Sequence, residues 1–238
     1  MRYHIFDKYI FNDNPVNDEF NVWLDYRDYN GQANPDTDVL VKELIDSDKF
    51  LKLVLKYHNP NKNRLFHIFY NDEKDYIITD CVINYKLDTK GKLELAKQAT
   101  KFYTTIFNQG DTVVVNLLTP NGHLSPVIPT SIENQAICEM LYNDKELEMG
   151  VSYIFDYKQL DFCLNEYTRY IKEGENSWPH NANVIIVNDL NEGNTLYKAL
   201  SIGGNKLYGY VIGANIDVVL NSRSYLTNND ISCYLLEK

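Results

Sequence analysis

The sequence has no long apolar run. Its longest uninterrupted apolar stretches, such as Val184 to Val187, are far shorter than the roughly 20 residues that a membrane-spanning helix needs. The N-terminus, Met1 to Asp7, breaks its apolar residues with charges and does not have the form of a secretory signal peptide. We therefore expect a soluble protein of the cytoplasm with no membrane partner.

Cysteine is scarce and widely spaced. The chain contains four, namely Cys81, Cys138, Cys163 and Cys233, with no CxxC pair and no histidine near them at metal-ligand spacing. This spacing does not support a zinc site or a redox motif. Without a secretory signal, a disulfide framework is not expected either. We predict buried free thiols.

The sequence also lacks the common catalytic and nucleotide-binding motifs. It contains no GxxxxGK[ST], GxGxxG, GxSxG or HExxH pattern. Asp36-Thr37-Asp38 fits the acidic N-terminus of a helix better than a metal-binding DxD motif. The calcium-loop-like start at Asp189 lacks its closing acid, because position twelve is Leu200. The histidines are scattered, one to a segment: His4, His58, His67, His123 and His180. We predict no catalytic residue, no metal and no cofactor.

Positive charge is in the minority. The chain has 238 residues and a formal net charge of -10, and residues 1–50 hold eleven acids against five bases. A negative field repels nucleic acid and anionic membranes, so neither is expected as a partner. The field would suit a basic protein partner. The alternative is a solvated acidic surface that keeps the protein soluble.

Apolar periodicity predicts both strands and helices. Helices are expected after Asn34-Pro35, over 92–108, from a capping box at Thr130–Glu133 to about 142, and over 157–174, capped by Asp156. In the last helix Leu160, Leu164, Tyr167 and Ile171 share one face, which we expect to be buried. Strands are expected at 3–11, 20–26, 65–70, 76–85, 112–119, 150–155, 184–188, 195–202 and 207–212.

The order of these elements indicates the fold class. The β-branched run 112–119 is typical of a central strand covered on both faces, and turns at 189–194 and 203–205 would join the last strands as hairpins. We predict an α+β fold, with an antiparallel or mixed sheet, hairpins and about four to five packing helices. Residues 1–238 would form a single domain; an alternative has two sub-lobes, 1–120 and 150–238, joined by a proline-containing segment.

One group of residues is a candidate for protein binding. Acids and tyrosines alternate at Asp25, Tyr26, Asp28 and Tyr29, and Trp178 lies elsewhere in the chain. In an interface, aromatic side chains supply contact area and carboxylates meet basic residues. The alternative is an edge strand that runs into an acidic turn.

A second, enzymatic possibility depends on three separated segments. Arg64, Thr130-Ser131 and Glu146-Leu147-Glu148 resemble the Arg, Ser-Thr-Ser and Glu-x-Glu elements of ADP-ribosyltransferases. The resemblance implies that the arginine binds the cofactor phosphate, the serine orders the site and the second glutamate binds the ribose. The competing explanations are a capping box at Thr130 and a charged loop around Glu146.

Residues 157–220 resemble the C-terminal part of the bacterial DUF3885 family. The matching features are the helix 157–174, the Trp178-Pro179 loop, the strand 183–188, Leu196-Tyr197 and the segment 215–219. The family has no known activity, so the resemblance implies no residue roles.

The sequence therefore favours a non-enzymatic acidic binding protein of a bacterium or its phage. It would act like an immunity protein or an inhibitor of host defence, and would bind a basic protein partner. The alternatives are an enzyme with an unrecognised site, most specifically an ADP-ribosyltransferase-like one, and a subunit of a larger assembly.

Overall fold

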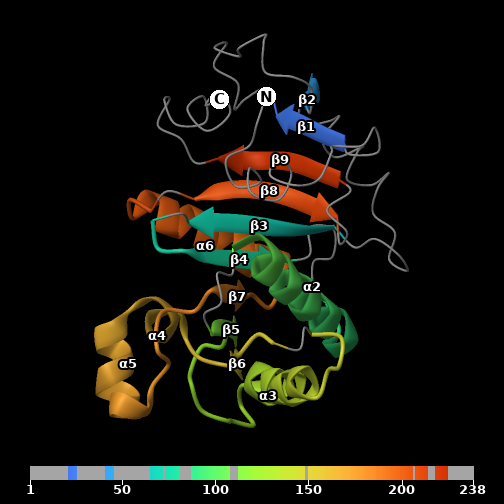
Figure 1. The fold of residues 1–238 in the computed structure, drawn as a ribbon. Coiled ribbons are helices and arrows are strands. Elements are labelled where there is room, and N and C mark those ends of the chain that lie inside the picture. The colour runs from blue at the N-terminus through green and yellow to red at the C-terminus, as the bar shows by residue number, and fades with distance from the viewer. Residues whose placement is uncertain are drawn as a thin grey trace. The chain divides into compact units, whose positions relative to one another are not determined.

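The computed structural model describes residues 21–25, 41–45, 65–71, 73–80, 87–107, 112–147, 150–205, 207–213 and 218–224 (Figure 1). The chain forms two compact units. Unit 1 combines residues 1–73 with 197–238, and unit 2 is the continuous segment 74–196. Each unit is described by itself. The single domain with sub-lobes 1–120 and 150–238 stays a prediction.

Unit 2 is built on four parallel strands. They are β4 (Tyr76–Asp80), β5 (Val113–Leu117), β6 (Tyr153–Asp156) and β7 (Val184–Ile186). Their spatial order is β4-β7-β5-β6, and all three neighbouring pairs are parallel. Each of the five residues of β5 is buried, and β5 lies between β7 and β6. The prediction of a covered central strand at 112–119 is confirmed, since a strand buried on both faces has such a nearly continuous apolar run.

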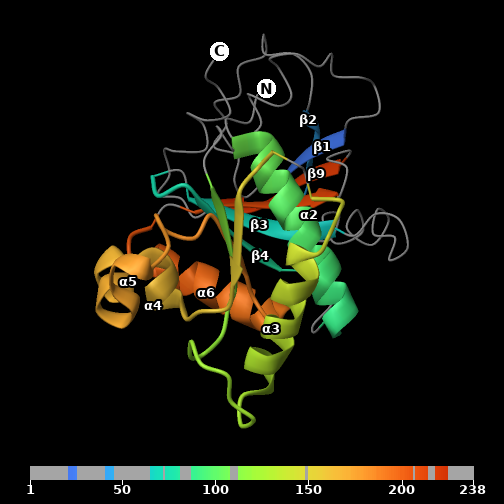
Figure 2. The same cartoon turned by 60° about the horizontal axis from the view of Figure 1, so that its bottom comes forward.

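Helices connect these strands and cover the sheet. They are α2 (Thr89–Phe107), α3 (Pro129–Tyr142), α4 (Leu160–Leu164), α5 (Glu166–Glu173), the short 3-10 helix η4 (Gly174–Asn176) and α6 (Leu190–Ile202). Figure 2 shows α2 and α3 on one side of the strands of unit 2, and α4, α5 and α6 on the other. The helices predicted at 92–108 and from Thr130 to about 142 are thus confirmed to within a few residues.

Unit 1 holds a mixed sheet. Its strands are β1 (Asn21–Asp25), β2 (Val41–Ile45), β3 (Leu65–Asn71), β8 (Tyr208–Gly213) and β9 (Val218–Ser224). β1 pairs in parallel with β2 and β9, whereas β8 is antiparallel to both β9 and β3. The helix predicted after Asn34-Pro35 is wrong over 41–45, because pairing with β1 makes this short segment a strand. With both units, the α+β fold class is confirmed.

The prediction of hairpins after β7 is wrong. Residues 190–202 form helix α6, where the sequence suggested a turn at 189–194 and a strand at 195–202. The side chain of Asp189 accepts the Glu192 N–H at 2.9 Å, and its carbonyl accepts the Gly193 N–H at 3.1 Å. Asp189 is therefore a helix N-cap, and the apparent calcium-loop rhythm is the first turn of a helix.

The helix predicted over 157–174 is broken in two. Asn165 has extended backbone angles between α4 and α5, and its side chain accepts the Thr168 N–H at 2.9 Å, which starts α5 anew. The predicted buried face is wrong, since Tyr167 is 72% and Ile171 63% exposed. Phe162 and Cys163 carry the buried side of α4 instead. Asp156 does not cap this helix but ends β6.

The capping box predicted at Thr130–Glu133 is also wrong. Pro129 sets the start of α3 earlier, and its N-cap, Ile128, makes no side-chain cap hydrogen bond. Ser131 Oγ instead donates to the Ile128 carbonyl at 2.8 Å and accepts the Ser125 N–H at 3.0 Å. The Glu133 carboxylate is consequently available for contacts with another helix.

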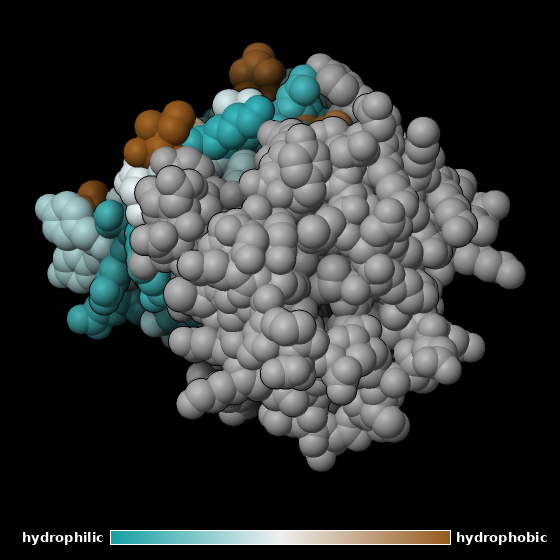
Figure 3. Space-filling view, turned by 90° about the horizontal axis from the view of Figure 1, so that it is seen from above, coloured by the Kyte–Doolittle hydropathy of each residue, from teal (hydrophilic) through white to brown (hydrophobic). Residues whose placement is uncertain are grey.

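On the face seen in Figure 3, the described apolar side chains stand in small separate groups among hydrophilic ones. No helix in the described ranges is long and apolar enough to cross a bilayer.

An ion pair between α2 and the turn after α3 predicts a pH-dependent stability. The Lys97 ammonium holds the pKa of Asp144 below its usual range, and Asp144 holds the pKa of Lys97 above its own. A lowered carboxyl pKa stabilises the fold above the unfolded pKa, and the gain is lost as the pH falls through the folded pKa. Asp144→Asn should therefore cost about 1 kcal/mol at pH 7, and this difference should shrink as the pH falls below the ordinary aspartate pKa of about 3.9 and through the lowered folded pKa.

Urea unfolding across the pH range measures this effect. Glu139→Gln, on the exposed part of α3, is the matched control and should show no such pH-dependent difference. A difference between wild type and Asp144→Asn that persists unchanged at low pH would contradict the ion-pair explanation.

Candidate functional site

The carboxyl ends of the parallel strands in unit 2 gather several polar side chains. Asp80 ends β4, Leu118 follows β5 directly, and Asn188 follows β7. In open sheets of parallel strands, ligands bind in the crevice outside this edge. The edge is therefore the first place to look for a functional site.

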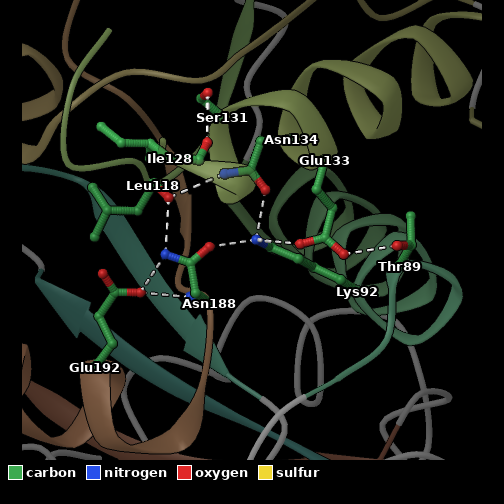
Figure 4. Close-up of polar contacts among 9 residues, drawn as sticks. All are labelled: Thr89, Lys92, Leu118, Ile128, Ser131, Glu133, Asn134, Asn188 and Glu192. Atoms are coloured by element: carbon green, nitrogen blue, oxygen red, sulfur yellow. Dashed lines mark hydrogen bonds and ion pairs between the residues drawn. The ribbon is translucent and has the colours of Figure 1, made fainter. Parts of the chain in front are cut away.

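A buried lysine is at the centre of this edge (Figure 4). Lys92, in the first turn of α2, is 1% exposed. Its ammonium donates to Asn134 Oδ1 and to Asn188 Oδ1, each at 2.5 Å, and lies 4.0 Å from Glu133 Oε2. A buried charge must be compensated in this way, because an ammonium without partners is very costly to bury. The three contacts join α2, α3 and the end of β7.

The two asparagines share one acceptor. The side-chain amides of Asn134 and Asn188 both donate to the Leu118 carbonyl, each at 3.1 Å. Glu192, in the first turn of α6, accepts both the backbone N–H of Asn188 at 2.6 Å and its side-chain amide at 2.8 Å. We call the set Lys92, Asn134, Asn188 and the Leu118 carbonyl the lysine node.

Glu133 links the lysine node to the start of α2. Glu133, whose side chain is 26% exposed, also accepts the Thr89 hydroxyl at 2.7 Å. With its ammonium buried and held by amide oxygens, Lys92 is placed to orient neighbouring groups rather than to meet a ligand from solvent. The hydrogen bonds of the node can fix the ends of β5 and β7 against α2 and α3.

The sequence analysis missed the lysine node, although one signal was present. Lys92 stands three, four and seven residues before Leu95, Ala96 and Ala99, all of which are buried. It therefore occupies the apolar face of α2, where a lysine needs partners. No spacing rule links it to Asn134 and Asn188, which lie on other elements far along the chain.

A close backbone approach holds α6 against the end of β4. A methyl group at Gly193 would collide with the Asp80 carboxylate and lie 3.2 Å from Val187 Cγ2. Asp80 is 1% exposed and has little room to move. Glycine at this position therefore lets α6 begin beside the candidate site.

Gly193→Ala should destabilise the protein by about 1 to 3 kcal/mol, because the added methyl overpacks this contact. In an uncrowded helix the same change would stabilise the protein by up to about 1 kcal/mol. The sign of the change in unfolding free energy therefore shows whether the position is crowded. Chemical denaturation measures it. Thr195→Ala, at an exposed position of α6, is the control and should be nearly neutral. A more stable Gly193→Ala would show that α6 does not approach Asp80 so closely.

A second polar group lies at the end of β6. Asp156 accepts the Trp178 indole N–H at 3.1 Å, and Lys158 pairs with both Asp156 and Glu173. Burial lowers the pKa of Lys158, but the hydrogen bond to Glu173 and the charge of Asp156 outweigh it, so its pKa is raised overall. This lysine is thus held as a cation that already has two carboxylate partners.

The residues predicted for protein binding are placed as follows. Trp178 is 9% exposed, and its ring meets Phe162 edge-on with 4.8 Å between centroids. Asp25 lies in β1, while Tyr26, Asp28 and Tyr29 fall outside the described residues. The structure does not bring these residues together into a described surface.

The residues that resemble ADP-ribosyltransferase elements are not assembled among the described residues. Arg64 and Glu148 fall outside them. Ser131 is buried and holds the turn before α3, and exposed Glu146 pairs with Lys101 at 3.4 Å. The described members thus have structural roles in separate places.

Two thiols are unsuited to nucleophilic chemistry. Burial, followed by the charge of Asp156, raises the pKa of Cys138 to about 12, and the same causes raise the pKa of Cys163 further. Both are free and buried, as predicted, while Cys81 and Cys233 lie outside the described residues. In the described part of the chain, no three His, Cys, Asp or Glu side chains could together hold a metal ion.

These raised pKa values predict slow thiol chemistry. In a Cys81→Ser/Cys233→Ser variant, Cys138 and Cys163 should react with an aromatic disulfide reagent far more slowly in native buffer than in denaturant, because the thiolate is the reactive form. Absorbance of the released thiol follows the reaction at pH 8. Rapid labelling of the native variant would show that one of the two thiols is accessible and ionised.

Comparison with solved structures assigns the fold to a class. The fold is that of phosphotransacylases: a branched-chain phosphotransacylase from Enterococcus faecalis V583 superposes with a TM-score of 0.61, at 17% sequence identity, over 98% of this chain and 92% of the other. A phosphotransacetylase from Staphylococcus aureus superposes with a TM-score of 0.52 at 21% identity, over 69% of this chain and 50% of the other.

The sequence itself is similar to particular curated enzymes. The phosphate acetyltransferases of Rickettsia felis and Rickettsia prowazekii are each 24% identical to it over 204 residues, which is 82% of this chain and 57% of theirs. The chain thus spans little more than half the length of these relatives. No protein-family profile matches it.

These similarities correct the function expected from the sequence. The prediction of a non-enzymatic immunity-like protein or host-defence inhibitor with a basic protein partner is wrong, because the similar proteins are enzymes named for acyl transfer to phosphate. The assignment to DUF3885 is wrong for the same reason. Acidity and missing motifs misled the argument, since neither excludes a catalytic site assembled from distant segments.

Proposed function

We propose that this protein is a cytoplasmic enzyme that transfers an acyl group between a thioester, such as acetyl-CoA, and inorganic phosphate. The observation that carries the proposal is the correspondence with a phosphotransacylase over 98% of this chain and 92% of the other. The sequence similarity to phosphate acetyltransferases over 204 residues supports it independently.

The reaction sets clear demands on the protein. An oxygen of phosphate attacks the acyl carbon, a C–O bond forms, the C–S bond breaks, and the thiol leaves with the proton that phosphate gives up. The phosphate and the thioester must be held in one reactive geometry, and the negative charge that develops on the acyl oxygen must be stabilised. A firmly held strand edge, such as the one around the lysine node, would support residues that hold the two substrates in this geometry.

Two sizes of acyl group are candidates for the substrate. The curated relatives are named for acetyl transfer, whereas the structure that matches nearly the whole chain is named for branched-chain acyl groups. A pocket discriminates weakly between neighbouring chain lengths, about 10- to 200-fold per methylene. The ratio of kcat/KM values across a substrate series is therefore the informative quantity.

The test is an assay of the purified protein with acyl phosphates and coenzyme A. Acetyl, propionyl, butyryl and isobutyryl phosphate are compared at equal concentration, and thioester formation is followed by absorbance. We expect thioester formation from at least one of these acyl phosphates, and, in the reverse direction, phosphate-dependent cleavage of the corresponding thioester. Absence of turnover with all four substrates, from protein shown by circular dichroism to be folded, would refute the proposal.

A further inference from the structure

We propose that Lys92 is a positioning residue for this acyl transfer, and that the lysine node sets the carboxyl ends of β5 and β7 in their reactive arrangement. The inference rests on the proposed function and adds to it a residue with a specific task. It starts from the hydrogen-bond chemistry of an ammonium group and of two side-chain amides.

An ammonium can only donate hydrogen bonds, and a side-chain amide has one accepting and one donating end. Because Lys92 Nζ meets Asn134 Oδ1 and Asn188 Oδ1, each at 2.5 Å, both amides must turn their NH2 groups away from the lysine. Both NH2 groups then reach the Leu118 carbonyl, each at 3.1 Å. One buried charge thus determines the orientation of two amides and the position of one backbone carbonyl.

This carbonyl lies where positioning matters for a ligand. Leu118 is the first residue after β5, and the loop from Thr119 to Ile128 leads from it to α3. The neighbouring backbone amides are also held, since Leu118 N–H donates to the Ile186 carbonyl of β7 at 2.8 Å and Thr119 N–H to the carbonyl of Lys158, after β6, at 3.2 Å. The lysine node therefore sets where β5 and β7 end, at the edge that binds ligands in such sheets.

The burial of Lys92 and Asn134 favours positioning over direct contact of these two residues with substrate, whereas Asn188 is half-buried. Lys92 is 1% exposed and Asn134 is fully buried, so neither offers a polar atom to a bound phosphate. A purely structural role would predict that loss of the node loosens the unit as a whole. A positioning role predicts a change confined to the strand ends, together with a loss of turnover in protein that remains folded.

The experiment compares Lys92→Met with Lys97→Met, which makes the same substitution five residues further along α2. Lys97 pairs with Asp144 and Glu94, neither of which belongs to the node. We expect kcat to fall about 100-fold in Lys92→Met with little change in KM, because small misplacement of reacting groups has effects of this size. Lys97→Met should keep the wild-type kcat.

Hydrogen exchange supplies a readout that is independent of turnover. In Lys92→Met the amides of Leu118 and Thr119 should exchange faster, whereas that of Val113, at the other end of β5 and bonded to the Ser152 carbonyl at 2.8 Å, should not. Equal acceleration at both ends of β5, or an unchanged kcat, would overturn the inference.

Asn134→Asp provides a second variant in case Lys92→Met does not fold. Aspartate still accepts from Lys92 but cannot donate to the Leu118 carbonyl, so the same selective exchange and loss of kcat are expected. If the wild-type protein shows no acyl transfer at all, the proposed function fails. In that case the hydrogen-exchange rates of Leu118 and Thr119, compared with that of Val113, still show whether the lysine node fixes the strand ends.

Discussion

Phe162→Ala should destabilise the protein by about 3 to 5 kcal/mol, the usual cost of deleting a fully buried aromatic side chain. Phe162 is 1% exposed, packs edge-on against Trp178 and has the Lys158 ammonium 5.2 Å from its ring centroid. Its removal leaves a cavity that the short helix α4 cannot fill. Thermal and urea unfolding, monitored by tryptophan fluorescence and circular dichroism, measure the loss.

Tyr167→Ala is the control for this prediction. Tyr167 lies on the same side of the helix that the sequence suggested, but it is exposed on α5, so its removal should change stability by less than about 0.5 kcal/mol. If the two variants lost stability equally, or Tyr167→Ala lost more, Tyr167 would be buried. The division into α4 and α5 at Asn165 would then be wrong, and one continuous helix over 157–174 would fit better.

Arg169→Met should lower the stability of the fold by about 3 kcal/mol, because it leaves several acceptors without the charged donor to which they were bonded. The buried guanidinium donates from Nη1 to the Phe162 carbonyl at 3.1 Å, the Cys163 carbonyl at 3.5 Å and Asn181 Oδ1 at 2.8 Å. These carbonyls lie near the end of α4, where a helix leaves its last acceptors without partners. The arginine thus supports the corner between α4 and α5.

Lys172→Met, in the same helix, removes a positive charge from an exposed pair with Asp161 and should change stability by less than about 1 kcal/mol. Arg169→Lys should recover only part of the loss, because the ammonium keeps the charge but does not match the shape of the guanidinium. Full stability of Arg169→Met in urea unfolding would contradict the assigned role of the guanidinium.

The elements that could be predicted from the sequence are those whose burial leaves a local pattern. β5 is buried on both faces and shows a nearly continuous apolar run, and α2 shows a helical apolar stripe over several turns. α6 is missed because its first residues, up to Asn194, are rich in Asn and Gly and are typical of a turn. The remaining residues 195–202 are then too few to indicate a helix by their periodicity.

The candidate site was hidden for a related reason. Lys92, Asn134 and Asn188 lie on three elements, and each residue alone is an ordinary polar residue in a helix or at a strand end. Their meeting depends on strand order, which brings the end of β7 beside the end of β5 although α3, β6, α4, α5 and η4 separate them in the chain. Charge and motif searches cannot detect such a site.

The discontinuity of unit 1 has a consequence for how the protein is made. Unit 2 is one continuous segment, so all of its strands are synthesised before β8 and β9. β3, by contrast, is synthesised early and must wait for its antiparallel neighbour β8, just as β1 must wait for β9. Domains generally fold as units in the order of synthesis. Biosynthesis should therefore complete unit 2 first, while β1 and β3 remain without these partners until β8 and β9 have been synthesised.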